Sequence, residues 1–280
     1  MKKLRRIVII AAEVLLLCLL LLVLVTNPGK SGWHSIAGRN LYYTDNSGLA
    51  RGYTLISGEP YFFGKTGLPR SEGWIQTDDG NDFYCCGGGK LATGWKYMDS
   101  KAYYFYKASD KTRKAGAQAK DYLTSGGIRV PEKGYLEGDE ALAIAYAIDV
   151  LNRYGWDLES AYKYSAALGF ISDSEETYGF RIHKCAIQGF KYGKGTCLAW
   201  AGTFCAMAKV MGYDCRLVWG TLPFRGENVP HGWAEIWEED GIHVYDPRKN
   251  DGKDMEGFDR RYREPGTRMY NEDSKQYMDW

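Results

Sequence analysis

The sequence predicts three successive structures: an apolar membrane-spanning helix, a solenoid of β-hairpins and an α+β domain. Three observations support them: an apolar run near the N-terminus, a glycine–aromatic pattern that repeats over residues 32–106, and helical periodicity followed by strand-like alternation after residue 121. A chain of 280 residues is long enough for two modest domains and an attachment. The net charge of +1 gives no electrostatic reason to expect a nucleic-acid partner.

Residues 1–26 have the pattern of a cytoplasmic basic flank and a signal-anchor. The flank contains Lys2, Lys3, Arg5 and Arg6. The apolar run from Ile7 to Val25 is interrupted only by Glu13, and as a helix it would span roughly 28 Å, close to the hydrocarbon thickness of a bilayer. The basic flank should stay in the cytoplasm. We therefore expect a single-pass membrane protein whose C-terminal region is extracellular.

Cleavage of this segment is the alternative. A signal peptide would carry small residues in an A-x-A pattern, and the VLVTNPGKSG that follows Leu22 does not. An uncleaved anchor is favoured, whereas cleavage would give a secreted, wall-associated protein. The cysteines show no C-x-x-C spacing, which argues against a zinc site and against thioredoxin chemistry. We expect no metal and no cofactor, and the disulfide state of Cys85 and Cys86 stays open.

Residues 32–106 repeat a glycine–aromatic signature. Gly-Trp or Gly-Tyr pairs begin, 20 or 21 residues apart, at Gly32, Gly52, Gly73 and Gly94. Eight or nine residues after each aromatic comes an aromatic pair: Tyr42-Tyr43, Tyr61-Phe62, Phe83-Tyr84 and Tyr103-Tyr104. Short aromatic strands with Gly, Asn and Asp turns predict successive hairpins. Because one hairpin cannot bury its own face, the repeats should stack into a solenoid.

This pattern resembles the choline-binding, or cell-wall-binding, repeats of surface proteins from Gram-positive bacteria. The resemblance implies aromatic cages for teichoic acid choline, or a glycan ligand, since ring faces attract a quaternary ammonium. The candidate ligand-binding residues are Trp33, Tyr43, Tyr53, Trp74, Tyr84, Trp95 and Tyr104. The alternative is that these rings only pack between hairpins. Residues 107–120 have little apolar content and are predicted to be a linker.

The sequence pattern of residues 121–280 is typical of an α+β domain. Helical spacing predicts a helix over residues 139–152, and Asp157 is placed to cap a second helix. A third helix should run from Cys197 to about Met211, where Gly212 ends it. Apolar residues surround this third helix on nearly all sides, which predicts a buried central helix.

Strands should follow that helix. We expect a strand over YDCRLVWG, a loop over TLPFRGENVP, and two strands, HGWAEIW and IHVYDP, joined by the turn EEDG. His231 and Asp246 then lie toward the same end of the last hairpin. His183 and His243 are the competing histidines, but His231 has this relation to a following aspartate.

Cys197, His231 and Asp246 together predict a catalytic triad. A thiol nucleophile needs a base to accept its proton and a third group to orient that base. An ordinary thiol is only about 3% ionised at pH 7, and a helix N-terminus and a nearby imidazolium both favour the thiolate form. Backbone N–H groups at a helix N-terminus can also hold a developing oxyanion. Cys205, deeper in the same helix, fits a core cysteine better.

The region from about residue 140 to 250 resembles the transglutaminase-like superfamily. The matching residues are Gly195-Thr196-Cys197, Gly212, Gly220, His231-Gly232-Trp233-Ala234-Glu235 and Asp246-Pro247. The resemblance implies a papain-like α+β fold with Cys197 as nucleophile, His231 as general base then acid, and Asp246 as orienter. Gly232 stands where alanine is common. Gln188 is a weak candidate for an extra oxyanion donor, and Trp233 is predicted to be structural.

These features give two function hypotheses. The first is a surface-anchored cysteine peptidase or acyltransferase that acts on peptide or protein amides through a thioester and is held near the cell wall by the repeats. Water as acceptor makes it a hydrolase and an amine makes it a crosslinker. The alternative is a catalytically idle fold in a cell-wall- or glycan-binding adhesion protein. The aromatics of the charged tail, residues 248–280, predict that it packs back on the domain.

Overall fold

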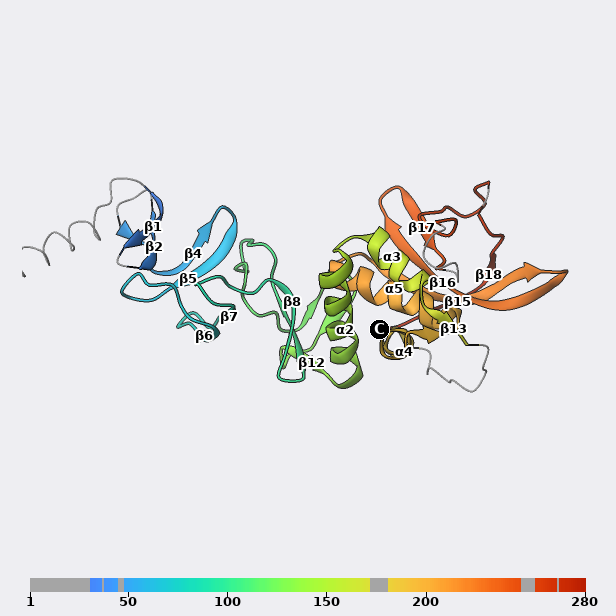
Figure 1. The fold of residues 1–280 in the computed structure, drawn as a ribbon, viewed down its shortest axis with the longest axis horizontal. Coiled ribbons are helices and arrows are strands. Elements are labelled where there is room, and N and C mark those ends of the chain that lie inside the picture. The colour runs from blue at the N-terminus through green and yellow to red at the C-terminus, as the bar shows by residue number, and fades with distance from the viewer. Residues whose placement is uncertain (1–30, 37, 45–47, 172–180, 248–254, 266) are drawn as a thin grey trace, which may run out of the picture. The chain divides into compact units, whose positions relative to one another are not determined.

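The structure is a computed structural model that describes residues 31–280 except 37, 45–47, 172–180, 248–254 and 266 (Figure 1). The predicted signal-anchor at residues 1–26 lies outside the described residues. Among those described, no helix is long and apolar enough to cross a membrane. By its contacts the chain divides into two units, residues up to Gly94 with Phe105–Gln118, and Trp95–Tyr104 with Ala119–Trp280.

The N-terminal unit is built from antiparallel hairpins, as the glycine–aromatic repeat predicts. The first pairs β1 (Gly32–Ile36) with β2 (Arg39–Thr44), which also pairs with β3 (Gly48–Leu49). The second pairs β4 (Gly52–Ile56) with β5 (Glu59–Phe63). The third pairs β6 (Gly73–Gln76) with β7 (Asp82–Cys85).

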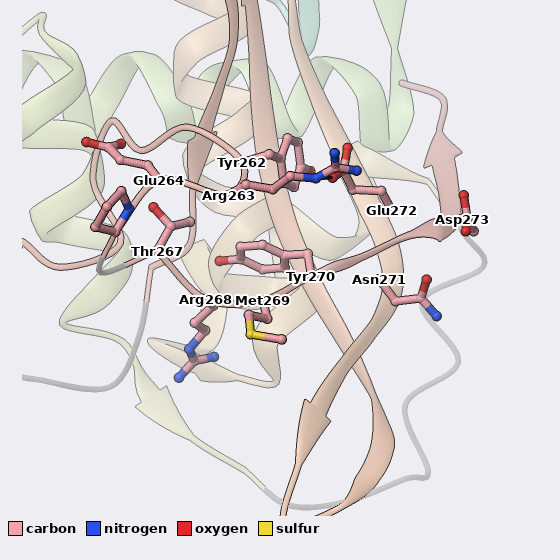
Figure 2. A pocket seen from close by; sticks show the side chains of 11 residues that line it. Tyr262, Arg263, Glu264, Thr267, Arg268, Met269, Tyr270, Asn271, Glu272 and Asp273 are labelled. Carbon is pink, nitrogen blue, oxygen red and sulfur yellow. Dashed lines mark hydrogen bonds and ion pairs between the residues drawn. The ribbon is translucent and has the colours of Figure 1, made fainter.

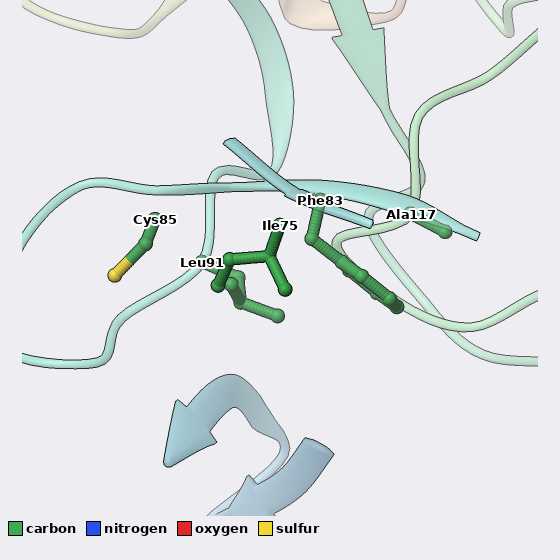
Figure 3. Packing of buried hydrophobic residues seen from close by; sticks show 5 residues of the cluster. All are labelled: Ile75, Phe83, Cys85, Leu91 and Ala117. Atoms are coloured by element: carbon green, nitrogen blue, oxygen red, sulfur yellow. The ribbon is translucent and has the colours of Figure 1, made fainter. Parts of the chain in front are cut away.

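The hairpins stack through their aromatic residues. Trp33 packs on Tyr61 of the next hairpin with ring centroids 5.7 Å apart, and Tyr53 packs on Phe83 at 5.5 Å. Figure 3 shows the small core under the third hairpin, formed by Ile75, Phe83, Cys85, Leu91 and Ala117. Each hairpin therefore completes its hydrophobic face with residues of its neighbour, which is the solenoid packing expected for a repeat too small to fold alone.

The segment predicted as a linker, residues 107–120, packs against this array over residues 107–118. The backbone N–H of Tyr106 donates to the carbonyl of Ala117 (2.9 Å), and Ala117 forms a β-bridge with Phe83. Ala115 and Ala117 are both 1% exposed. Low apolar content suggested a solvated linker, but alanine fits where two backbones approach closely.

In the C-terminal unit, the fourth hairpin extends a sheet of this unit. It is formed by β8 (Gly94–Met98) and β9 (Lys101–Phe105), and β9 pairs with β12 (Tyr135–Glu137). Two further short strands, β10 (Tyr122–Leu123) and β11 (Arg129–Val130), pair with each other. Trp95–Tyr104 thus lies in the same unit as the α+β domain, whose predicted start was residue 121.

The predicted helices form, with one addition. Helix α2 covers Gly138–Tyr154 and α3 covers Leu158–Ala166, whose N-cap Asp157 accepts from the N–H of Ser160 (2.7 Å). Helix α5 covers Cys197–Met211 and ends at the left-handed Gly212 (φ +112°). The unpredicted helix α4 (Ile182–Tyr192) buries His183 and Gly189, which hide its apolar stripe in the sequence. The short strands β13 (Gly169–Phe170) and β14 (Lys194–Gly195) pair in parallel.

A four-stranded antiparallel sheet completes this unit, in the order β17-β16-β15-β18. Its strands are β15 (Cys215–Phe224), β16 (Glu227–Glu238), β17 (Gly241–Tyr245) and β18 (Asn271–Met278). Helix α5 contacts β15 and β16 on one side and α2, α3 and α4 on others (Figure 1). It is the buried central helix that its sequence predicts, and its N-terminus faces the sheet.

The expected loop TLPFRGENVP is instead the end of a long hairpin. Strands β15 and β16 stay paired to Phe224↔Glu227 and turn at Arg225 and Gly226, which both have positive φ. Pro223 and Pro230 suggested a loop, but both lie where the ladder has only one partner strand. Their missing N–H groups are therefore not needed by a second neighbour.

Candidate active site

Helix α5 presents Cys197 at its first position. Thr196, the N-cap, has extended backbone angles, and the backbone N–H groups of the first turn have no partner inside the helix. The residues behind it, such as Ala199 and Trp200, are buried, whereas Cys197 is partly exposed. The burial of the helix body thus fixes the sulfur at the edge of the core, where a substrate can reach it.

The β15–β16–β17 ladder brings His231 and Asp246 to the same end of the sheet. His231 pairs with Gly220, and the pair Ala234↔Tyr245 places Asp246 one residue beyond β17. His231 Nε2 lies 3.0 Å from Asp246 Oδ1. Cys197 also interacts with this imidazole, and because Nε2 faces Asp246, Nδ1 is the nitrogen left for the sulfur. The structure therefore brings together all three predicted catalytic residues.

Gly232 lets strand β16 approach the start of α5. Its N–H donates to the sulfur of Cys197 (3.3 Å). A Cβ at this position would lie 2.7 Å from Leu198 Cδ2 and 3.3 Å from the Leu198 Cα. An alanine at this position would therefore force the side chain of Leu198 to shift and would pack tightly against the Leu198 backbone.

Replacing Gly232 by alanine should cost about 1–3 kcal/mol of unfolding free energy, because the new methyl overpacks against Leu198. Urea denaturation measures the loss. In a double-mutant cycle with Leu198→Ala, the combined variant should lose less than the sum of the two single changes, because the shorter side chain makes room. Equal stability of Gly232→Ala and the wild type would contradict the steric account.

Charge pairing dominates the electrostatics of the site. Burial alone would lower the pKa of His231, but the charge and hydrogen bond of Asp246, followed by the contact with Cys197, raise it to about 9. Burial would raise the pKa of the fully buried Asp246, but the neighbouring His231 brings it below its usual range. Both groups are therefore charged near neutral pH, and an imidazolium stands beside the thiol.

The C-terminal segment supplies further contacts to Asp246. The hydroxyl of Tyr270 donates to Asp246 Oδ2 (2.8 Å), and Arg268 Nη1 lies 3.3 Å from the same oxygen. On the backbone side, the Tyr162 hydroxyl donates to the Asp246 carbonyl (3.1 Å), and the Asp246 N–H donates to the Gly257 carbonyl (2.8 Å). Sequence reasoning missed Tyr270 and Arg268. The only signal was the aromatic content of the tail, which packs back as predicted.

Trp233 and Glu235 of the H-x-W-x-E motif hold the C-terminal segment against β16. Glu235 is fully buried and accepts hydrogen bonds from Tyr262, Lys275 (3.2 Å), Tyr277 (3.1 Å) and Trp237 (3.1 Å). Trp233 is likewise fully buried, and its Nε1–H donates to Tyr262 Oη (2.6 Å). Both residues of the motif are therefore structural, and they hold the loop that carries Arg268 and Tyr270.

A pocket of about 630 Å³ lies in this C-terminal segment (Figure 2). Its lining includes Arg268, Met269, Tyr270 and Glu272, with Arg263 paired to Glu272 at 3.0 Å. Cys197 is not among the lining residues. The pocket adjoins the aspartate side of the triad rather than the sulfur.

The other histidines lie elsewhere. His183 on α4 packs its ring on Trp280, and burial lowers its pKa. His243 on β17 contacts Asp259 (2.6 Å) and Asp240 (3.0 Å). Glu238, Asp240 and His243 could hold a metal ion by distance, but Asp240 already pairs with Arg261. The oxyanion candidate Gln188 lies on α4.

The candidate ligand residues of the repeats fall into three groups by exposure. Trp33 and Trp74 are 44% and 40% exposed. Tyr53 and Tyr84 are half-buried. Tyr43, Trp95 and Tyr104 are buried, so their rings contribute packing.

Trp33 lines a pocket of about 540 Å³ in the N-terminal unit. The other lining residues are Arg39, Asn40, Tyr61, Leu68, Pro69, Gly88 and Lys90. The pocket therefore joins ring faces with positive charge, part of which Glu59 offsets through its ion pair with Lys90 (3.2 Å). Cys85 is buried while Cys86 is exposed, and all six cysteines of the described residues are free thiols.

The site thus combines a cysteine on a central helix with a histidine and an aspartate on an antiparallel sheet. The family model of the transglutaminase-like superfamily matches residues 151–247, which contain Cys197, His231 and Asp246. This match confirms the resemblance predicted from the sequence for that region. A comparison with curated proteins finds no match.

The similar solved structures include a choline-binding protein, an autolysin and an endolysin. Choline binding protein F from Streptococcus pneumoniae is 24% identical with a TM-score of 0.29, over 39% of this chain and 34% of that chain. The modular autolysin LytC from Streptococcus pneumoniae is 20% identical with a TM-score of 0.28, over 38% and 22%. The pneumococcal cell wall endolysin from phage Cp-1, complexed with choline, is 22% identical with a TM-score of 0.24, over 27% and 22%. The chain thus spans about a third or less of these proteins.

Proposed function

We propose that this protein is a cysteine acyl-transfer enzyme of the cell surface that acts on peptide or protein amides. One observation carries the proposal. The thiol of Cys197 contacts the imidazole of His231, whose Nε2 lies 3.0 Å from the buried carboxylate of Asp246. A structural cysteine at a helix start needs neither an imidazolium nor a partly exposed sulfur.

The reaction follows from this geometry. Because His231 is already protonated near neutral pH, the proton of Cys197 has left the sulfur, and the thiolate attacks the carbonyl carbon of the amide. The backbone N–H of Cys197 has no partner within the helix, and it would stabilise the oxyanion. The carbon–nitrogen bond then breaks, His231 returns its proton to the leaving amine, and a thioester remains. Water or a second amine attacks this thioester, gives up a proton to His231 and releases the thiolate.

The acceptor decides between two activities with the same residues. Water makes the protein a peptidase or amidase, and an amine makes it a crosslinking enzyme. The proposed substrates are peptide amides of the wall or of surface proteins. This choice rests on the signal-anchor pattern of residues 1–26, which would hold the enzyme in the membrane with its C-terminal region outside, or release it to the wall after cleavage.

Labelling of Cys197 tests the catalytic proposal. The full-length protein is alkylated with iodoacetamide from pH 5 to 9, and mass spectrometry identifies the modified cysteine. We expect fast labelling of Cys197 below pH 7, slowed roughly tenfold or more in His231→Ala, because the imidazolium that stabilises the thiolate is gone.

Two controls sharpen this experiment. Cys86 is the exposed cysteine of the described residues and reports the rate of an ordinary thiol. His243→Ala removes a histidine that contacts Asp240 and Asp259 instead of the site, and it should leave the Cys197 rate unchanged. Labelling of Cys197 that matches Cys86 at every pH would exclude the acyl-transfer proposal and leave the idle-fold alternative.

The repeats are proposed to bind a cell-wall polymer. The pocket of Trp33 and Tyr61 offers ring faces that suit a quaternary ammonium or a sugar ring. Arg39 and Lys90 at the same pocket suit the phosphates of a teichoic acid chain. Binding here would keep the catalytic unit near its substrates.

Replacing Trp33 by alanine should reduce retention on purified Gram-positive cell walls about tenfold, because the largest ring face of the pocket is lost. A sedimentation assay measures the bound fraction, and Leu55→Ala, at a similarly exposed apolar residue of the same unit, is the matched control. Release by free choline would identify a choline site, and release only by salt would identify phosphate contacts. Unchanged retention of Trp33→Ala would remove this pocket from the binding surface.

A further inference from the structure

The two carboxylate oxygens of Asp246 accept contacts from three donors. Oδ1 accepts from Nε2 of His231 (3.0 Å), and Oδ2 is shared by the hydroxyl of Tyr270 (2.8 Å) and Nη1 of Arg268 (3.3 Å). The side chain of Asp246 is 0% exposed. Protein groups rather than water therefore decide which donors each oxygen serves.

Arg268 competes with His231 for this carboxylate. Its Nη1 lies 3.4 Å from Nε2 of His231, but that nitrogen carries the hydrogen that it donates to Asp246, and a protonated imidazole offers no acceptor. The contact therefore brings two cations together with Asp246 between them. A guanidinium prefers to bind both oxygens of a carboxylate, and a bidentate pair here would take Oδ1 away from the imidazole.

Tyr270 is held in place independently of the carboxylate. Its ring packs on Trp233 with centroids 4.6 Å apart, and Trp233 is fully buried. Trp233 in turn stacks on the ring of His231 at 6.3 Å. The hydroxyl of Tyr270 is thus a fixed donor, whereas Arg268 has a long flexible side chain that is 33% exposed. Figure 2 shows both side chains on the C-terminal segment.

We propose that Tyr270 is a positioning residue of the site: its hydroxyl fixes Oδ2 of Asp246 and so keeps Oδ1 on His231 rather than on Arg268. The inference deepens the proposed function and rests on it, because it takes His231 to be the proton partner of Cys197. It assigns to a residue outside the matched superfamily region the task of orienting the aspartate.

Few charged or titratable groups face the imidazole within the described residues. They are Cys197 from α5, Asp246 after β17, and Arg268 and Tyr270 from the C-terminal segment, while Tyr162 from α3 reaches the Asp246 backbone. The titration of His231 therefore reports how well Asp246 is held. A well-placed carboxylate raises the midpoint, and a carboxylate captured by Arg268 lowers it.

The test is the NMR titration of His231 in the full-length protein in detergent, with His231→Gln to assign the signal. In Tyr270→Phe, which keeps the ring packing, the midpoint should fall from about 9 by about one pH unit or more. Cys197 alkylation at pH 8 should then slow about twofold or more, because at most about half of His231 stays protonated. Arg268→Gln alone should raise the midpoint, since it removes a neighbouring cation. Arg268→Gln combined with Tyr270→Phe should restore the midpoint toward wild type.

The matched comparison is Tyr162→Phe. It also removes one buried hydroxyl bonded to Asp246, but to the backbone carbonyl instead of the carboxylate. Each of three results would overturn the proposal. The first is a His231 midpoint in Tyr270→Phe equal to that of the wild type, and the second is the same shift in Tyr162→Phe. The third is no recovery of the midpoint in the Arg268→Gln, Tyr270→Phe double variant. The NMR titration needs no turnover. Unreactive Cys197 in the wild type, with separated midpoints, would therefore reject the proposed function and leave the role of Tyr270 standing.

Discussion

Replacing Asp246 by alanine is expected to cost about 3–5 kcal/mol of unfolding free energy and to slow Cys197 alkylation at pH 7 roughly a hundredfold. The change leaves the imidazole of His231, the guanidinium of Arg268 and the hydroxyl of Tyr270 without their shared acceptor. The pKa of His231 should then fall from about 9 to below its ordinary 6.5, because burial lowers it and the largest opposing contribution, that of Asp246, is gone. Urea denaturation and alkylation rates measure the two effects.

The pH dependence of this loss has a definite sign. The raised pKa of His231 means that its protonation stabilises the folded state fully below pH 6.5, and that this stability is lost as the pH rises through about 9. The lowered pKa of Asp246 contributes stability above its ordinary 3.8, which is lost as the pH falls. The difference between wild type and Asp246→Ala should therefore be largest between about pH 4 and 6.5 and smaller at pH 10.

Two variants separate charge from orientation. Asp246→Asn keeps an acceptor for His231 but removes the negative charge, so it should retain more stability than alanine and still lower the pKa of His231. Asp273→Asn, at an exposed position of β18, is the matched control and should behave as wild type. A stability of Asp246→Ala within 1 kcal/mol of wild type, about the loss of one neutral hydrogen bond, would contradict the buried ion pair.

Glu235→Ala should be the most destabilising change away from the triad, at about 3–5 kcal/mol, because it leaves the ammonium of Lys275 without its partner. The hydroxyls of Tyr262 and Tyr277 and the indole of Trp237 lose an acceptor at the same time. At 2–4 °C per kcal/mol for a domain of this size, the melting temperature should fall by roughly 10 °C. Differential scanning calorimetry measures it.

The control for this change is Glu239→Ala, which removes an exposed carboxylate from the β16–β17 turn. It should shift the melting temperature little. Glu235→Gln keeps an acceptor without the charge and should fall between alanine and wild type. If Glu235→Ala has the melting temperature of the wild type, the packing of the C-terminal segment does not depend on this carboxylate.

The sequence predicted the elements with strong local signals. Helix α5 begins and ends where the glycines and Cys197 suggest, and the capping carboxylate of Asp157 marks α3. Helix α4 could not be predicted because His183 and Gly189 lie on its buried face. Strands β15 and β16 were cut short because prolines are tolerated in a ladder with a single partner, which only the tertiary arrangement reveals.

Only the part of the site that has local sequence signals could be predicted. Cys197, His231 and Asp246 lie in local patterns that a single sequence shows. Tyr270 and Arg268 act on Asp246 only through the pairing of β18 with β15, which joins Leu217 to Met278. No local signal marks that pairing, because the tail has mixed charge and an irregular periodicity.

The pairing of β15 with β18 also bears on the order of folding. Hairpins between neighbouring strands close short loops, whereas bringing Met278 to Leu217 closes a long one, and distant contacts form late because their entropy cost comes first. Cys197, His231 and Asp246 can therefore come together before β18 pairs with β15. Full reactivity of the thiol would then be the last property of the domain to mature, acquired when β18 docks.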